Sequence, residues 1–473
     1  MECVNAELRE DAVRRLRQAI GRVQEFLRRH DRGVSVAADP TRTLCASLCA
    51  EAQQFLRRSL SRSAPSEHTL RTAYRLAAAL GSLVASNAPA VAESTPLNSF
   101  PLAFNRDVVA YARYGGAEIV AQEAAYTSML GIDAERARLL LTSSGMAAYA
   151  LIETFLLREV LRSGDRILLN PGIYFETRHQ LQSLPFFERT IACGSTRMDM
   201  LDGIVEHRPR VVFVDPLTNS SELRLIDLPQ LLDDAEEVCE QETWFVIDGT
   251  LLSGSFDPFA KPRRCVRVLY YESGCKYLQI GADLGPTGIV IVERVLAAQF
   301  EHWRRGIGAI AADTLVLPRI SRHAYLAFLR QQTACATAIA ESVQAGMPQG
   351  TPVMMCSFPS QATHPDHGEA LHYEHLGGVV ALRFLEPRLN VRRPLELFID
   401  QLIAAARVRG VPLTAGVSFG FRVPRVGAAW ISYDGDEAFL RLSAGVSLES
   451  AAQLGQLMVE CAHRFKWPEG KSE

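Results

Sequence analysis

The chain has 473 residues, of which 48% are hydrophobic and 22% charged, and its formal net charge at pH 7 is −3. This composition is that of a globular protein with a sizeable core, and the length predicts about three domain-sized units. The balanced charge gives no electrostatic reason to expect nucleic acid or an acidic membrane as a partner.

Cysteine usage and the N-terminal residues bear on the compartment. Ten cysteines are scattered singly along the sequence, which favours reduced thiols over a disulfide framework. The first residues mix acids with arginines and lack the apolar stretch of a signal peptide. No apolar run is long enough to predict a membrane span. We therefore expect a cytoplasmic protein without a membrane partner.

The first 97 residues are predicted to form a helical extension. Apolar residues recur at helical spacing between Ala12 and Leu27, and two further helical segments are expected at Thr41–Leu60 and Glu67–Ser86. The stretch Asn87–Pro101 is rich in Ala, Pro, Ser and Asn, which is typical of a linker.

From about residue 136 onward, short apolar strands alternate with helices such as Met146–Leu161 and Leu228–Cys239. Strands are expected at Arg138–Leu141, Arg166–Leu169, Arg210–Val214, Trp244–Ile247, Val266–Tyr271 and Gly288–Val292. Buried strands separated by helices predict a largely parallel sheet with helices on both faces. We assign residues 98–345 to this large α/β domain.

The pattern changes again after a long helix expected at Ser321–Ala345. The strands expected beyond it are Val379–Phe384, Ala428–Tyr433 and Phe439–Ser443, and the helices are Leu395–Arg409 and Ser447–Phe465. Residues 346–473 are therefore predicted to form a smaller α+β domain.

Lys276 and Asp248 are the most informative pair in the sequence. Asp248 ends the strand Trp244–Ile247, and Lys276 follows Ser273 and Cys275 in a small loop after the next strand. Pyridoxal phosphate (PLP) requires an amine for its aldehyde and a carboxylate that keeps its pyridine nitrogen protonated. This pair is therefore a candidate PLP site.

A turn rich in small residues joins a predicted strand to a helix at Ser143-Ser144-Gly145-Met146. The free N–H groups and the dipole at a helix start attract anions, and glycine allows a phosphate to approach closely. The motif is weak by itself, because the serine could act only as a helix cap.

Two other strand ends supply Tyr174 and Asn219. An aromatic ring at Tyr174 could stack on a pyridine ring, although an ordinary core tyrosine would give the same pattern. Ligands of open α/β sheets bind outside the carboxyl ends of the strands, so all these loops are expected on one rim.

With these motifs, residues 98–465 resemble the Cys/Met-metabolism enzymes of fold type I, the transsulfuration group that includes cystathionine gamma-synthase and gamma-lyase. The resemblance implies a large, mostly parallel α/β/α domain of the seven-stranded type and PLP as the cofactor. Its phosphate segment matches Ser144, Gly145 and Met146, and its Ser-x-Thr-Lys segment matches Ser273 to Lys276, with Cys275 in place of threonine.

The resemblance also implies a shared active site. Tyr111 and Arg113 match a segment that reaches the cofactor phosphate of a neighbouring subunit, which implies a homodimer or homotetramer. Arg441 matches the arginine that binds the substrate carboxylate, and Ser418 lies in the matching substrate loop, with Tyr111 also beside the substrate. Three places depart from the family pattern: 116–118, 175–176 and Cys275.

The chemistry that the resemblance implies is deprotonation of an amino acid at Cα, with Lys276 as the base, Tyr174 assisting and Asp248 opposite the ring nitrogen. Elimination or replacement at Cγ or Cβ then follows, through a vinylglycine-type intermediate in the Cγ case. The departures favour a specialised biosynthetic member with a Cγ-activated donor such as S-adenosylmethionine or an O-acylhomoserine. An aminotransferase of the same fold and a non-catalytic assembly or regulatory protein are the alternatives.

Four histidines at positions 364–375 lie among acids and could bind a metal. The family carries a similar stretch as a domain connection, so we expect no metal site.

Overall fold

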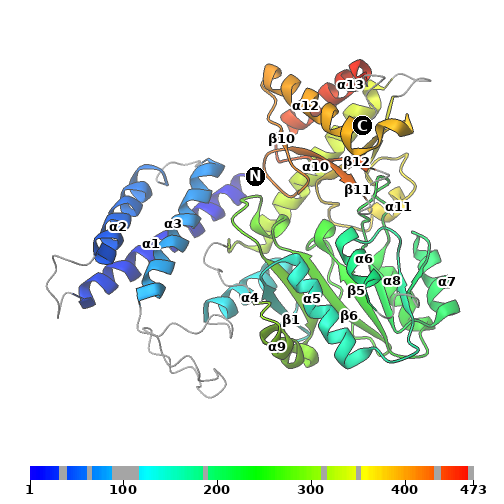
Figure 1. Ribbon diagram of the computed structural model, residues 1–473, viewed down its shortest axis with the longest axis horizontal. Coiled ribbons are helices and arrows are strands. Elements are labelled where there is room, and N and C mark those ends of the chain that lie inside the picture. The colour runs from blue at the N-terminus through cyan, green and yellow to red at the C-terminus, as the bar shows by residue number, and fades with distance from the viewer. Residues whose placement is uncertain are drawn as a thin grey trace.

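The computed structural model describes residues 1–30, 40–60, 66–87, 117–184, 190–310, 317–347, 353–430 and 438–466. A group of N-terminal helices is followed by a large part built on a seven-stranded sheet and a smaller part built on a five-stranded sheet. The N-terminal helices extend away from the body of the molecule (Figure 1). The predicted fold class is therefore confirmed. Tyr111, Arg113 and nearly all of the predicted linker lie outside the described residues.

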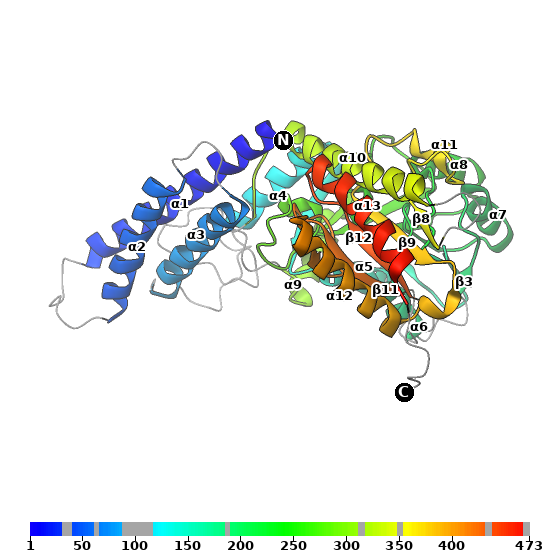
Figure 2. The same cartoon turned by 90° about the horizontal axis from the view of Figure 1, so that it is seen from above.

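The N-terminal helices are α1 (Glu2–His30), α2 (Pro40–Arg58) and α3 (Glu67–Asn87). Helix α1 buries a stripe that includes Val4, Leu8, Ala12 and Leu16, because residues four apart share one face of a helix. It packs lengthwise against α3 and α2, and its first turns reach α10 (Arg322–Gly346) (Figure 2).

Buried polar contacts join α1 to the large domain. The Asp11 carboxylate accepts hydrogen bonds from Arg15 Nε at 3.0 Å, from the Tyr74 hydroxyl at 2.8 Å and from the Arg319 backbone N–H at 3.1 Å. Arg15 also donates to Gln122 Oε1, 3.0 Å away on α4 (Ala117–Leu130). Because these groups are out of water, each needs its partner, and the extension is fixed to the large domain.

The large sheet has the strand order β1-β7-β6-β5-β4-β2-β3. Strand β7 is antiparallel to both of its neighbours, and the remaining pairs are parallel. The strands are β1 (Ala137–Thr142), β2 (Ile167–Leu169), β3 (Thr190–Ala192), β4 (Val211–Val214), β5 (Thr243–Asp248), β6 (Val266–Ser273) and β7 (Gly288–Glu293). Strand β3 was not predicted, since it is a short edge strand that is not buried.

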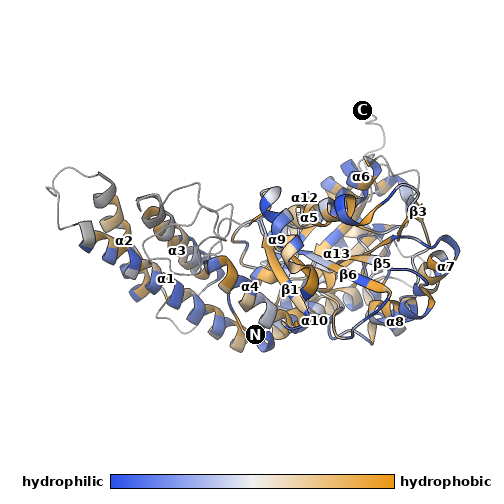
Figure 3. Ribbon diagram, turned by 90° about the horizontal axis from the view of Figure 1, so that it is seen from below, coloured by the Kyte–Doolittle hydropathy of each residue, from blue (hydrophilic) through white to orange (hydrophobic). Residues whose placement is uncertain are grey.

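Helices cover both faces of this sheet, as its sequence pattern predicts. Phe213 of β4 packs in a cluster with α5, whereas Val212 and Val214 face the cluster that contains α7 and α8. The strands are accordingly apolar along their length (Figure 3). The helices of this part are α5 (Gly145–Phe155), continued by a π-helical turn (Leu156–Val160), α6 (Phe175–Gln182), α7 (Arg197–His207), α8 (Leu228–Val238) and α9 (Ala297–Gly306).

The smaller sheet has the order β10-β11-β12-β9-β8 and is antiparallel except for the pair β10–β11. Its strands are β8 (Met354–Ser357), β9 (Val379–Phe384), β10 (Thr414–Ala415), β11 (Arg425–Trp430) and β12 (Ala438–Ser443). The accompanying helices are α11 (His367–Ala370), α12 (Arg392–Arg409) and α13 (Leu448–Arg464). Helix α10 packs against α13, β8 and β9.

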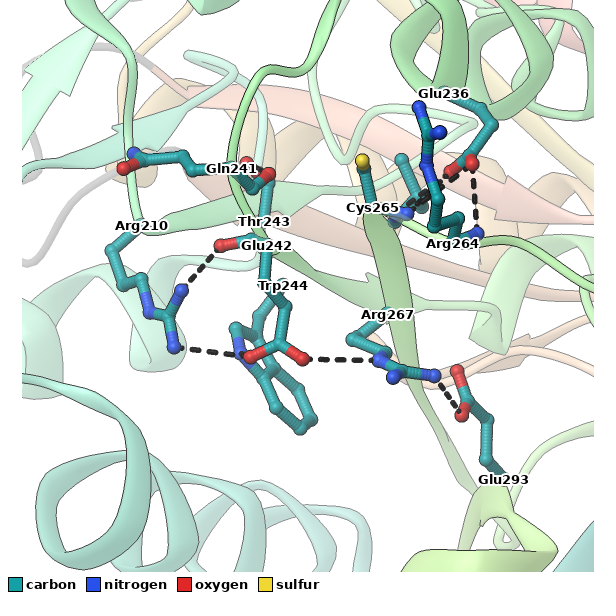
Figure 4. Close-up of polar contacts among 11 residues, drawn as sticks. Arg210, Glu236, Gln241, Glu242, Thr243, Trp244, Arg264, Cys265, Arg267 and Glu293 are labelled. Carbon is teal, nitrogen blue, oxygen red and sulfur yellow. Dashed lines mark hydrogen bonds and ion pairs between the residues drawn. The ribbon is translucent and has the colours of Figure 1, made fainter.

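A series of ion pairs lies along the amino-terminal edge of the large sheet (Figure 4). Arg210 and Arg267 both contact the Glu242 carboxylate, at 3.0 and 3.2 Å, and Arg267 also contacts Glu293 at 2.8 Å. The polar residues predicted to act together lie at the opposite, carboxyl edge. Within the described residues, no helix is long and apolar enough to cross a membrane.

Candidate active site

A cavity of about 250 Å³ opens at the carboxyl edge of the large sheet. It collects every predicted site residue that the structure describes. Its walls include the predicted residues Ser144, Gly145, Met146, Tyr174, Asn219, Asp248, Ser273, Cys275, Lys276, Ser418 and Arg441. These residues come from seven separate loops or strand ends, so the fold brings together residues that are far apart in the sequence.

The start of α5 forms one wall. Ser144 caps the helix, with its Oγ accepting from the Ala147 N–H at 3.0 Å. A Cβ placed on Gly145 would lie only 2.7 Å from the Cβ of Ser273. The glycine is thus required for the turn to approach the lysine-bearing segment. The serine's capping role and an anion site coexist here, because capping leaves other N–H groups at the helix start free to bind a phosphate.

Two neighbouring carboxyl groups lie beneath the cavity. Asp248 accepts from the Thr250 N–H at 2.9 Å, and the nearby Tyr271 side chain acts to lower its pKa. Asp215 accepts from the Tyr174 N–H at 2.8 Å. Burial raises the pKa of both acids, and the charge of Asp248 raises that of Asp215 further. A cationic ring N–H beside Asp248 would compensate this buried charge.

Lys276 follows β6 and enters the same cavity. Its Nζ lies 5.7 Å from the centre of the Phe419 ring. Burial lowers the pKa of Lys276, and the positive charge of Arg441 acts in the same direction, whereas Asp248 opposes the shift. An amine whose charged form is disfavoured is more often neutral near pH 7, so it can attack an aldehyde or accept a proton. The adjacent Cys275 thiol points toward the Thr287 carbonyl, 3.8 Å away.

Arg441 of β12 faces the cavity from the smaller sheet. Its Nη1 donates to Asn219 Oδ1 at 2.7 Å, and its Nη2 donates to the Val417 carbonyl. Its Nε is buried and has no hydrogen-bond partner among the described residues. Burial lowers the pKa of Arg441 to about 10. A guanidinium whose Nε–H has no partner can bind a carboxylate ligand. Asn219, which was predicted to lie on this rim, orients the arginine.

Eight further residues line the cavity and were not proposed as site residues from the sequence. Besides the aliphatic Leu217, Leu251 and Val417, they are Glu176, Asp215, Thr250, Tyr271 and Phe419. Asp215 follows strand β4, so its position at a strand end was a usable signal. Phe419 could not be found in this way, since it reaches the cavity from a loop of the smaller part. Glu176 was noted only as a departure from the family pattern.

The histidine-rich stretch does not line the cavity; it runs between β8 and β9 of the smaller sheet and contacts the large part. His364 and His375 hydrogen bond through Nε2 to the carbonyls of Glu222 and Ser253, each at 2.9 Å. His372 Nδ1 lies 2.5 Å from the Asp227 carboxylate. The polar atoms of His372, Asp227 and Glu369 lie within 4.8 Å of one another.

Comparison with known proteins identifies the family. The model of the Cys/Met metabolism PLP-dependent enzyme family matches residues 99–402. The chain belongs to this family. Its cofactor is accordingly PLP, and the expectation from the Lys276 and Asp248 motifs is confirmed at the level of the family and the cofactor.

A curated relative is the bifunctional enzyme flvA of Aspergillus flavus, which is 28% identical over 410 residues. The match covers 84% of this chain but 48% of the relative, so the chain spans about half of that protein's length. Among solved structures, cystathionine gamma synthase of Xanthomonas oryzae, in complex with aminoacrylate and cysteine, has a TM-score of 0.60 at 22% identity over 77% of this chain and 91% of that one. Cystathionine gamma-lyase of Lactobacillus plantarum, complexed with L-serine, has a TM-score of 0.59 at 19% identity over 79% and 92%.

The residues of the cavity fit PLP. The start of α5, open beside Gly145, suits the phosphate, and Asp248 suits the ring nitrogen. Lys276 supplies the amine, and Tyr174 is an aromatic ring on the cavity wall. The similarity to cystathionine gamma-synthase and gamma-lyase structures is one of fold, and the substrate must be argued from the site itself.

Proposed function

We propose that this enzyme deprotonates an amino acid at Cα and then eliminates or replaces a group at Cγ, or at Cβ. The observation that carries the proposal is the position of Lys276 and Arg441 in one cavity with Asp248. Bound PLP supplies an aldehyde for the substrate amine and a protonated ring that withdraws electrons from Cα.

Each residue then has a defined task. Arg441 binds the substrate carboxylate, since its guanidinium is buried, charged and already oriented by Asn219. Asp248 keeps the ring nitrogen protonated, and the Thr250 N–H holds its carboxylate in place. Lys276 takes the Cα proton, because burial favours its neutral, basic form. Tyr174 stacks on the ring and assists proton transfer at the leaving group.

Chemistry at Cγ requires a second proton transfer. Lys276 would have to remove a proton from Cβ after the one from Cα, so that a Cγ substituent can leave and a nucleophile can add. The Phe175–Glu176 and Cys275 departures support a specialised biosynthetic enzyme with a Cγ-activated donor such as S-adenosylmethionine or an O-acylhomoserine.

Isotope exchange tests this proposal directly. The PLP-loaded enzyme is incubated in D₂O with methionine, cystathionine, cysteine or O-acetylhomoserine, and deuterium is located by NMR. Exchange at both Cα and Cβ supports Cγ chemistry with Lys276 as the proton carrier. Exchange at Cα alone, with the cofactor recovered as pyridoxamine phosphate, would establish the aminotransferase alternative instead. Lys276→Ala should abolish exchange at both carbons.

We also propose that the chain works as a homodimer or homotetramer in which Tyr111 and Arg113 complete the neighbouring subunit's site. The boundaries 1–97, 98–345 and 346–473 divide it into the helical extension, the PLP-binding domain and the small domain. None of the ten cysteines, all of which lie in the described residues, forms a disulfide, which supports a cytoplasmic location. Mixing Lys276→Ala and Arg113→Ala subunits tests the shared site, because complementation should restore about a quarter of the active sites only if they lie between subunits.

A further inference from the structure

Glu176 places an acidic side chain in the wall of the cavity. It stands in the first turn of α6, two residues after Tyr174, at a place where the chain departs from the family pattern. A helix start stabilises a carboxylate. The Glu176 carboxylate lies close enough to Tyr174 and Lys276 to act electrostatically on both side chains. Glu176 therefore faces the volume in which the substrate reacts.

The other charges of the cavity already have partners within the proposed function. Asp248 serves the ring nitrogen and Arg441 the substrate carboxylate, and Asp215 is held by the Tyr174 N–H. Lys276 binds the cofactor. Glu176 lies in the same cavity wall, and the proposed function assigns it no partner.

We propose that Glu176 binds a positively charged group at the distal end of the substrate. A carboxylate in a partly buried cavity attracts a cation and repels or ignores neutral and acidic groups. Two cations would lie near the reacting Cγ: the sulfonium of the donor, which departs as a neutral thioether, and the ammonium that forms when a neutral amine adds at Cγ. The inference rests on the proposed function, since both cations are defined by chemistry at Cγ.

The test uses pairs of ligands that differ in charge at one position. S-Methylmethionine and methionine compare a sulfonium with a thioether, and 2,4-diaminobutyrate and homoserine compare an ammonium with a hydroxyl. Binding to the PLP-loaded, full-length protein is followed by the visible absorbance of the cofactor. It is measured in the Lys276→Ala variant, and also as the initial spectral change of the protein that retains Lys276. The ratio of the two dissociation constants in each pair is the measured quantity.

Glu176→Gln retains the size and a polar oxygen of the side chain but removes the charge. We expect it to weaken binding of the cationic member of a pair about tenfold, with little change for the neutral member. If the variant no longer prefers S-methylmethionine over methionine, the cation that Glu176 binds belongs to the donor. If it no longer prefers 2,4-diaminobutyrate over homoserine, the cation belongs to the amine that adds at Cγ. Glu206→Gln, an exposed substitution on α7, controls for the change in net charge.

Equal weakening of both members of each pair would overturn the proposal, because Glu176 would then act only by positioning Tyr174. Unchanged binding in both pairs would overturn it as well. Failure of the proposed function looks different: no ligand would then perturb the cofactor spectrum, even in the protein with Glu176 intact. Glu176→Asp, with its charge retained, should keep most of the selectivity if charge is the cause.

Discussion

The approach of Gly145 to Ser273 gives the sharpest test of the phosphate site. In Gly145→Ala, the new Cβ would lie 2.7 Å from the Cβ of Ser273 and 2.9 Å from its Cα. Carbon atoms in contact are about 3.5 Å apart or more. The start of α5 and the segment before Lys276 must therefore separate by roughly 0.8 Å, and both are walls of the PLP site.

Overpacking of this kind costs about 1–3 kcal/mol, which corresponds to an increase of about 5-fold to 150-fold in a dissociation constant. We expect this free-energy cost to appear as weaker PLP binding, as a lower melting temperature of the apoprotein, or as both. PLP binding is measured by absorbance titration of the apoprotein, and melting by circular dichroism.

Gly368→Ala is the matched control, because a Cβ there meets no atom within 4 Å and the residue lies outside the cavity. It should bind PLP as the unmodified protein does. If Gly145→Ala changes neither PLP affinity by more than twofold nor the melting temperature, the close approach of the two walls is not required for the site.

Three further changes probe the surroundings of the site. Tyr271→Phe removes a hydroxyl that favours the charged form of Asp248 by lowering its pKa and should weaken PLP binding about fivefold; an unchanged titration would show that the hydroxyl does not support Asp248. Burial raises the pKa of Glu272 to about 8, so the folded protein retains a proton that the unfolded chain loses above pH 4.5. The contribution of Glu272 to stability is complete below that pH and is lost as the pH rises through about 8, so the melting temperature should fall over this range. Glu272→Gln should flatten that fall, and an unaltered pH profile of the melting temperature would contradict the assignment. Asp11→Asn leaves the buried Arg15 guanidinium without its carboxylate partner and should cost about 3 kcal/mol, seen as faster proteolysis of the N-terminal helices, whereas a rate equal to that of the unmodified protein would show that this contact does not hold them.

Much of the fold could be predicted because its elements have strong local signals. The strand at 211–214 consists of apolar residues that are all buried, and a parallel strand covered on both faces requires this. Edge strands lack such a signal. Strand β3 has three residues, none of them fully buried, so neither its length nor its pattern distinguished it from a loop.

The site was predictable where a residue's chemistry and its place at a strand end coincide, as for Asp248 and Lys276. It was not predictable where the partner comes from elsewhere in the chain. Phe419 lies beside Lys276 because Gly420 packs against the lysine's own backbone: a Cβ on Gly420 would be 2.7 Å from the Lys276 carbonyl carbon. No local pattern near residue 420 records that contact.

The sequence by itself determined the cofactor class, the order of the elements and the chemical groups of the site, because each depends on residue types at local spacings. Only the tertiary structure decided that Arg441 is oriented by Asn219, and that Glu176 shares a cavity with Lys276. The physical reason is that charge and burial act through space. The role of a carboxylate depends on the groups that face it in the folded protein, and the order of residues along the chain does not specify those groups.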